Sequence, residues 1–246
     1  MRTREDIPPC LRRPPVELEI VIPAVNEERR LPRTIESTVD YLRGQTWSSA
    51  VVVVDNDSVD STIDVPERFD SSAIPVHVIG CSEHGKGAAV RRGIVTSTAR
   101  FVGFLDADNA TPIETLDKVL PLLRDGYAAA IASRHVDGSR FEVEESAMRQ
   151  CGGWLFRRLT RLSLPDIADT QCGFKFFDGR LARDVAPTCR VDGFAFDVEL
   201  LARMVRAGGT VIEVPVAWSD MPGSTFSARR DGIRSMADVL RISLTR

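Results

Sequence analysis

The chain has 246 residues, a formal net charge of −3 and a hydrophobic content of 43%. This size and composition are typical of one globular domain, and the slightly acidic charge excludes the basic surface that draws in nucleic acid. No apolar run approaches the roughly 18 residues that a membrane-spanning helix needs, so we expect no transmembrane segment.

The five cysteines are widely spaced and contain no Cys-x-x-Cys pair, which predicts neither a zinc site nor a disulfide framework. Reduced thiols are typical of the cytoplasm, where we expect the protein to act. Residues 1–15 are rich in Pro and Arg and lack the apolar core of a signal peptide. We therefore expect a flexible N-terminal segment at 1–15 and a single domain at 16–246.

Strands and helices alternate along the chain. In order, the apolar patterns predict strand 17–23, helix 27–42, strand 50–54, strand 74–79, helix 87–97, strand 101–105, helix 111–123, strand 128–132, a mobile acidic loop at 136–145, helix 146–164, a loop at 166–173, helix 195–207, strand 210–216 and helix 231–243. This alternation predicts an α/β fold with a mostly parallel sheet flanked by helices, in which ligands bind at the carboxyl ends of the strands.

The strand at 101–105 is followed directly by Asp106-Ala107-Asp108. Carboxylates at i and i+2 project to the same side of an extended or turning backbone, and hard oxygen donors suit Mg²⁺ or Mn²⁺. Such ions usually share their coordination with substrate phosphates, so the pattern favours a metal site. The alternative is that both aspartates cap the helix that begins near Thr111.

Further polar clusters lie at or near predicted strand ends. With DADNATP (106–112), they are VIPAVNEERRLPRTI (21–35), VVVDNDSVDST (52–62), GKGAAVRRG (85–93), SR (133–134), DTQCGFKFF (169–177) and FAFDVELL (194–201). Together they resemble the family 2 glycosyltransferases of GT-A fold, and within them the dolichyl-phosphate β-glucosyltransferase group. The resemblance covers about residues 17–245, and DTQCGFK and FAFDVELL are more specific to it than Asp-X-Asp.

The resemblance implies an enzyme with the GT-A nucleotide-diphospho-sugar transferase fold that breaks the anomeric bond of a UDP- or GDP-linked sugar. It implies a divalent cation, Mn²⁺ or Mg²⁺, as cofactor, with Asp106 facing the ribose or the metal and Asp108 facing the metal. A cation at this position offsets the charge that grows on the departing diphosphate.

By position, the resemblance also implies residues that contact the sugar nucleotide, the donor of the reaction, at the ends of the first two strands. They are Pro23, Asn26, Glu27, Asp55 and Asn56. Lys86 lies in a Gly-Lys-Gly turn at a helix start, where its ammonium and the free backbone N–H groups could meet a phosphate. The alternative is a simple turn with a solvated lysine.

Asp169 is the first choice for a catalytic base, because it opens the DTQCGFK loop that resembles the family's proposed base region. Gln171 in the same loop is a candidate substrate contact. Asp197 and Glu199 are further candidate bases, but residues two positions apart on a helix cannot share one face, so at most one points into the site. Helix capping or ion pairing is the alternative for each of these carboxylates.

Cationic side chains are candidates to clamp the diphosphate or an anionic acceptor. They are Arg134, Lys175, Arg229 and Arg230. The last two follow the stretch MPGSTFSA, which has the composition of a lid that orders on substrate binding. The alternative is a solvated start to the final helix.

Val25 stands where the family usually has an aromatic residue, and Asn56 where it has a second aspartate. Both positions lie near the nucleotide base, so UDP and GDP both stay open.

The resemblance leaves a small molecule or a lipid phosphate open as the acceptor, since the family's membrane relatives transfer sugar to a polyprenyl phosphate. The basic residues of 153–164 could rest on anionic lipid, or could edge a buried apolar stripe; they are Arg157, Arg158 and Arg161.

Transfer to an acceptor is therefore the first functional hypothesis. The alternative is a GDP-sugar pyranose/furanose mutase, which would rearrange the bound sugar nucleotide within one molecule. This alternative rests on a resemblance of the chain to soluble bacterial family 2-like proteins of antibiotic pathways. It would work without flavin, because no dinucleotide-binding GxGxxG is present. A third hypothesis is a sugar-nucleotide binding protein without turnover.

Overall fold

The computed structural model describes residues 13–71, 73–141, 147–219 and 230–244. Residues 1–12, most of the segment predicted to be flexible, lie outside these ranges. At the end of that segment, Arg13 is buried, and its guanidinium donates hydrogen bonds to the Glu19 carboxylate at 2.9 and 2.7 Å. Arg13 is therefore held against the folded domain.

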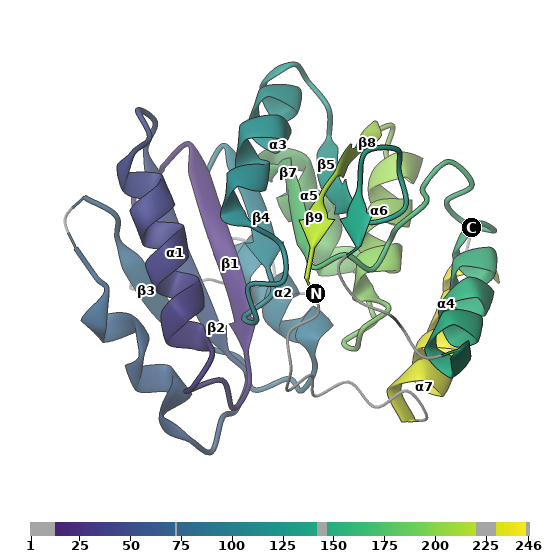
Figure 1. Ribbon diagram of the computed structural model, residues 1–246, viewed down its shortest axis with the longest axis horizontal. Helices are drawn as coiled ribbons and strands as arrows, with labels where there is room; N and C mark the ends of the chain where they lie inside the picture. The colour runs from purple at the N-terminus through teal and green to yellow at the C-terminus, as the bar shows by residue number, and fades with distance from the viewer. Residues whose placement is uncertain (1–12, 72, 142–146, 220–229, 245–246) are drawn as a thin grey trace.

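A seven-stranded sheet forms the centre of the molecule, in the order β3-β2-β1-β4-β7-β5-β8 (Figure 1). Its strands are β1 (Leu18–Ala24), β2 (Ser49–Asp55), β3 (Val76–Gly80), β4 (Phe101–Leu105), β5 (Ala129–Ser133), β7 (Phe174–Asp178) and β8 (Val211–Pro215). Neighbouring strands are parallel, except that β7 runs antiparallel to both β4 and β5. The predicted α/β fold, with a mostly parallel sheet flanked by helices, is confirmed.

Helices cover both faces of this sheet. They are α1 (Leu31–Arg43), α2 (Lys86–Thr96), α3 (Leu116–Arg124), α4 (Ala147–Thr160), α5 (Gly179–Val185), α6 (Phe196–Arg206) and α7 (Arg230–Leu244). One apolar core joins α1 and α3 to the sheet, and a second joins α2, α5 and α6 to the opposite face. In Figure 1, α1 and α3 lie in front of the sheet, and α4 lies beside α7 at one end. No helix within the described ranges combines the length and the apolar character needed to cross a membrane.

The valine run of β2 shows why both faces need cover. Val52 and Val54 belong to the core that contains α2, whereas Val51 and Val53 belong to the core that contains α1. Successive side chains of a strand point to opposite faces, so a strand that is apolar throughout must be buried on both.

The sequence patterns do not predict β7 or α5. β7 has only five residues, FKFFD, and its first four are buried, so it shows neither alternation nor the length of a helix. The loop predicted at 136–145 contains a two-residue strand, β6 (Arg140–Phe141), that pairs with β9 (Ala217–Trp218); residues 142–146 lie outside the described ranges.

Two predicted helices begin later than expected. The helix predicted from residue 27 begins at Leu31, with proline in its first turn. The one predicted from residue 111 begins as a 3₁₀ turn, η5 (Ile113–Thr115), and continues as α3. The residues between each strand end and the true helix start therefore form loops at the carboxyl edge of the sheet.

The direction of β7 brings two of the polar motifs of the sequence, DADNATP and DTQCGFKFF, to one edge. Leu105 at the end of β4 pairs with Phe174 at the start of β7. The loop that follows β4 and the loop that precedes β7 therefore meet beyond the carboxyl ends of the parallel strands, where ligands bind in sheets of this kind.

Gly103 sits at the tightest point of the β4–β7 pair. A Cβ there would lie 2.1 Å from Cδ1 of Phe176 and 2.5 Å from the carbonyl oxygen of Lys175. We expect Gly103→Ala to lower the free energy of unfolding by about 1–3 kcal/mol, the usual cost of overpacking, in urea denaturation. Gly80→Ala in the edge strand β3 is the matched control, because a Cβ there meets nothing within 4 Å. An equal loss in both variants would contradict this packing.

Candidate active site

Asp106 links the loop after β4 to two other segments. Its carboxylate Oδ1 lies 2.7 Å from Lys86 Nζ, in the Gly-Lys-Gly turn that opens α2. Its backbone N–H donates to the carbonyl oxygen of Gly173 at 3.0 Å. A Cβ on Gly173 would lie 1.9 Å from Asp106 Oδ2, so only glycine lets the loop before β7 approach this carboxylate. Sequence reasoning missed Gly173, although a glycine inside a polar motif is the signal for such an approach.

Lys86 is held as an ammonium ion. Burial opposes its charged form, but the carboxylates of Asp106 and Asp197 outweigh this effect and raise the pKa of Lys86. The ring of Phe104 lies beneath the ammonium, with its centroid 5.4 Å from Nζ. The Lys86 side chain is 18% exposed and that of Asp106 is 33% exposed. This ion pair therefore lies at the surface of the edge, where a ligand can reach it.

Asp108 does not cap a helix. Its Oδ1 accepts a hydrogen bond from the backbone N–H of Ala110 at 3.0 Å, whereas η5 begins beyond Pro112 without any side-chain cap. The capping alternative is therefore wrong. Burial, and then the negative charge of Asp106, raise the pKa of Asp108, as expected of two carboxylates placed close together.

The donor chemistry of this pair fits a hard divalent cation that shares its coordination with a substrate. Within the described ranges, no three His, Cys, Asp or Glu side chains come together as a ligand group. Mg²⁺ and Mn²⁺ do not require one, because they are commonly bound by one or two carboxylates together with substrate phosphates. Asp106 and Asp108 are the residues that would hold such an ion.

The loops after β1, β2 and β4 each contain a residue in the left-handed backbone region. Asn26, Asp57 and Asn109 have φ values of 56°, 63° and 59°. Asn and Asp tolerate this region better than other non-glycine residues, and backbone strain of this kind concentrates at functional sites. The strain therefore falls on the edge that carries Asp106.

Some of the residues predicted to contact the sugar nucleotide already make hydrogen bonds within the protein. Asn26 binds the loop after β2: its backbone N–H donates to Ser58 Oγ, and its Oδ1 accepts from the backbone N–H of Val59. Glu27 is buried, and its carboxylate is paired with Arg30 at 2.7 and 2.5 Å. Both residues therefore tie the first loop to its surroundings.

Asp55 has one carboxylate oxygen without a hydrogen-bond partner within the described residues. It is buried, and its Oδ1 has no hydrogen-bond partner among the described residues, while Oδ2 accepts weakly from the backbone N–H of Ser58 at 3.4 Å. A buried acceptor without a partner costs free energy unless a ligand supplies the donor. Pro23 lies within β1, paired with Val54 of β2, and Val25 is 37% exposed.

Asn56 is not free to contact a substrate, which corrects its assignment as a donor contact. Its Nδ2 donates to the carbonyl oxygens of Cys81 and Glu83, at 3.1 and 2.7 Å, and its Oδ1 accepts from the backbone N–H of Gly85 at 2.8 Å. A carboxylate could not donate these bonds. The change from Asp to Asn therefore serves the turn that carries Lys86.

Both oxygens of the Asp169 carboxylate already accept hydrogen bonds, which does not fit its prediction as the catalytic base. It is 2% exposed, and it accepts from Arg134 Nε, Nη2 and backbone N–H, at 2.7, 2.9 and 3.0 Å. The backbone N–H groups of Gln171 and Cys172 also donate to it. Burial alone would raise the pKa of Asp169, but the Arg134 charge and these hydrogen bonds lower it well below its usual range. A carboxylate of this kind is a weak proton acceptor, and it orients Arg134.

Arg134 itself faces the same edge. Its side chain is 18% exposed, and its guanidinium lies 5.3 Å from the ring centroid of Trp218. Trp218 was missed, because β9 is too short and too distant in sequence to suggest the contact. Gln171 Nε2 donates to the carbonyl oxygen of Thr170 at 3.2 Å.

Lys175 and Asp197 form an ion pair under the site, which corrects both catalytic assignments. Lys175 Nζ lies 2.9 Å from Asp197 Oδ2 and also donates to the carbonyl oxygen of Cys172. The two side chains are 0% and 5% exposed, so neither can contact a diphosphate. Glu199 lies on another face of α6, as expected, and accepts from Arg203 and from the backbone N–H groups of Arg190 and Val191.

The structure does not test the two remaining basic candidates. Arg229 is outside the described residues, and Arg230 is described only as the first residue of α7. On α4, Phe156 and Leu159 pack against the core, and Arg158 is exposed, as expected of an apolar stripe with a solvated basic edge, whereas Trp154 and Leu155 are 58% and 42% exposed.

Comparison with solved structures identifies the class of fold. Glucosyl-3-phosphoglycerate synthase from Mycobacterium tuberculosis, in complex with UDP, matches with a TM-score of 0.72 and 17% identity, covering 94% of this chain and 81% of that one. The same protein in complex with Mn²⁺ and UDP-glucose matches with a TM-score of 0.70 and 16% identity. The fold is therefore that of the GT-A glycosyltransferases.

Comparison of sequences identifies the family. The family described as glycosyl transferase family 2 matches residues 19–184. Dolichyl-phosphate beta-glucosyltransferase from Homo sapiens is 30% identical, covering 98% of this chain and 79% of the human protein. The Drosophila melanogaster protein of the same name is 32% identical, covering 87% and 70%. The chain belongs to glycosyltransferase family 2, and the predicted resemblance and enzyme class are confirmed.

The buried ion pair gives a test of its structural role. Lys175→Met leaves the Asp197 carboxylate buried without its partner, which should lower the free energy of unfolding by about 3–5 kcal/mol. The double variant with Asp197→Leu removes both charges and should recover most of that loss, measured by urea denaturation. A Lys175→Met protein that kept its stability but lost activity would instead support direct contact with substrate.

The Asp169–Arg134 pair predicts a pH dependence. A carboxyl whose folded-state pKa is lowered contributes stability that is complete above its unfolded pKa, about 4, and that is lost as the pH falls toward the folded pKa. We expect Asp169→Asn to cost about 3 kcal/mol at pH 7 and clearly less at pH 3, in urea denaturation at each pH. Asp40→Asn, an exposed surface variant on α1, is the control and should show no such trend. The idea is lost if the Asp169→Asn cost is the same at both pH values.

Proposed function

We propose that this family 2 glycosyltransferase transfers a sugar from a nucleoside diphosphate sugar, bound through a divalent cation, to a phosphate-bearing acceptor. The proposal rests on the loop from Asp169 to Gly173, which contacts both the carboxylate proposed to bind the metal and the arginine proposed to bind the acceptor. Gly173 contacts Asp106, and Asp169 holds Arg134. A metal-binding carboxylate and an oriented guanidinium therefore share one support.

The donor half consists of Asp106, Asp108 and Lys86. The cation, when bound, would offset the charge that develops on the departing diphosphate. Lys86 would supply a second positive charge beside it, since its ammonium is already held at Asp106. The unpartnered Oδ1 of Asp55 would accept a hydrogen bond from the nucleotide.

The acceptor half consists of Arg134, fixed by Asp169. The sequence relatives are named for dolichyl phosphate, and a phosphate monoester is already ionised at neutral pH, so it needs no base to remove a proton before it attacks. This matches the state of the three predicted bases, because Asp169, Asp197 and Glu199 are each engaged with cationic or backbone donors. A guanidinium is well suited to hold phosphate oxygens in a fixed orientation.

A second candidate function is the intramolecular pyranose/furanose mutase. It uses the same donor half, because it also breaks the anomeric bond to the diphosphate; the ring hydroxyl that recaptures the sugar would pass its proton to the departing phosphate. It requires the same diphosphate grip but no acceptor.

The two functions separate in one assay. The protein is incubated with Mn²⁺ and UDP- or GDP-sugars, with and without a polyprenyl phosphate, and products are separated by chromatography and mass spectrometry. Transfer gives a glycosylated lipid phosphate only when the acceptor is present. The mutase gives, without acceptor, a nucleotide sugar of unchanged mass and altered retention. If no nucleotide sugar binds better with metal, the proposal fails; metal-dependent binding without product under any condition leaves only a binding protein.

Asp108→Asn tests the metal site. Loss of one carboxylate should lower turnover by about 100-fold or more, because charge on the departing diphosphate is no longer offset. Folding should be unaffected, since Asp108 makes one local hydrogen bond. The readouts are turnover, Mn²⁺-dependent nucleotide binding by calorimetry, and the urea midpoint, with Asp40→Asn as the charge-matched control. Equal turnover in the two variants would overturn the assignment.

A further inference from the structure

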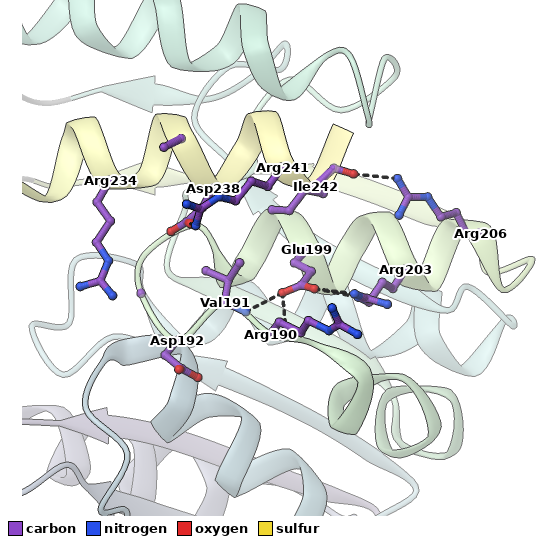
Figure 2. A pocket seen from close by; sticks show the side chains of 12 residues that line it. Arg190, Val191, Asp192, Glu199, Arg203, Arg206, Arg234, Asp238, Arg241 and Ile242 are labelled. Atoms are coloured by element: carbon purple, nitrogen blue, oxygen red, sulfur yellow. Dashed lines mark hydrogen bonds and ion pairs between the residues drawn. The ribbon is translucent and has the colours of Figure 1, made fainter. Parts of the chain in front are cut away.

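A cavity of about 710 Å³ lies between α6, α7 and the segment 190–193 (Figure 2). Five arginines line it: Arg190, Arg203, Arg206, Arg234 and Arg241. Its volume is within the range of small-molecule sites, which run from about 300 to 1,000 Å³. None of the proposed donor or acceptor residues lies in its walls.

The acidic residues of this cavity are already paired. Glu199 accepts from Arg203 and from the backbone of 190–191, and Asp238 pairs with Arg241 at 3.3 Å. Asp192 pairs with Arg91 of α2 at 2.5 Å. Figure 2 shows the Glu199 carboxylate in the cavity wall, bonded to Arg203 and to the backbone of 190–191. The three negative charges in the walls therefore do not neutralise the remaining arginines.

Positive charge is left over in the walls. Arg190 and Arg234 are exposed, and neither has an ion-pair partner within the described residues. Arg206 donates one hydrogen bond to the carbonyl oxygen of Ile242, at 3.1 Å, which satisfies a donor but not a charge. In a chain of net charge −3, this concentration of guanidinium groups favours an anion, and the planar fork of arginine suits phosphate oxygens.

One wall of the cavity also supports the turn that carries Lys86. The carbonyl oxygen of Asp192 accepts from the backbone N–H of Ala88 at 3.2 Å. A Cβ on Gly85 would lie 2.2 Å from that oxygen, and a Cβ on Gly87 would lie 2.9 Å from the carbonyl oxygen of Gly193. The segment 190–193 thus faces the cavity on one side and the Gly-Lys-Gly turn on the other.

We propose that this cavity binds a small, multiply charged phosphate-bearing anion, and that its occupancy steadies the Lys86 turn through residues 190–193. The site is separate from the donor site, and it needs no divalent cation, because its positive charge comes from arginine. An anion held in the cavity, between segment 190–193 and α7, would restrict that segment and thereby the start of α2.

Inorganic pyrophosphate is the probe, titrated by calorimetry at low ionic strength with EDTA present, so that cation-dependent binding at the donor site is removed. We expect a single site with a dissociation constant below about 1 mM. The double variant Arg190→Gln/Arg234→Gln should weaken it at least about tenfold, which corresponds to about 1.4 kcal/mol. Arg68→Gln, an exposed arginine in η4 (Pro66–Arg68), is the matched control and should bind as wild type does.

Lys86→Gln separates the two sites. Pyrophosphate binding that survives Lys86→Gln and is lost in the double arginine variant supports the cavity, whereas binding lost only in Lys86→Gln assigns the anion to the donor site and overturns the proposal. No binding of either pyrophosphate or the vesicles described next, or equal weakening by Arg68→Gln, also overturns it. Vesicles containing phosphatidic acid form a second arm: if only these bind, and the arginine variant abolishes that binding, the anion is a lipid headgroup rather than a dissolved phosphate.

Coupling to the turn has its own readout. In the Lys86→Gln protein, amide hydrogen exchange at the first turn of α2 should slow when pyrophosphate is added, and it should not slow in the same protein carrying the arginine substitutions. Unchanged exchange despite saturated binding would show that the cavity and the turn are independent.

Discussion

The antiparallel strand β7, inserted between β4 and β5, is the constraint on which the candidate site depends. In a wholly parallel sheet, the residues that precede a strand lie at the opposite edge from those that follow its neighbours. Reversing one strand brings the loop before β7 to the carboxyl ends of β4 and β5. The close approach of Gly103 to Phe176, and of Gly173 to Asp106, shows that this placement is secured by packing on both sides of the ladder.

The charges of the site form a series ordered by exposure. Lys175 and Asp197 are fully enclosed and bind each other, and Asp169 is enclosed while Arg134 reaches the surface. Lys86 and Asp106 are both partly open. Because breaking a buried pair leaves an uncompensated charge, the enclosed pairs are rigid supports, and only the open one can exchange its partner for a ligand. The ring of Phe104, within 5.4 Å of Lys86 and 5.3 Å of Lys175, separates the two levels.

The sequence was sufficient to predict the alternating fold, the position of the Asp106–Asp108 pair and the family, because long periodic segments and specific motifs carry that information. It was insufficient for β7, whose apolar residues are buried on both faces and so show no periodicity. The roles of Asp169, Lys175 and Asp197 were misjudged for a related reason. A charged residue in a motif looks the same whether it faces a substrate or a partner, and the partners here come from distant segments, Arg134 for Asp169 and α6 for Lys175.

Asn56 has a consequence for how the specificity of such a protein can change. Its amide binds three backbone groups of the segment that leads into Lys86, so a substitution of Asn56 would also release the turn that carries Lys86. An evolving or engineered variant would therefore have to change its preference for the nucleotide base at neighbouring positions whose side chains do not bond the Lys86 turn. Val25, exposed and apolar, and Asp55, with an acceptor to spare, are the positions where drift can occur without loss of the turn.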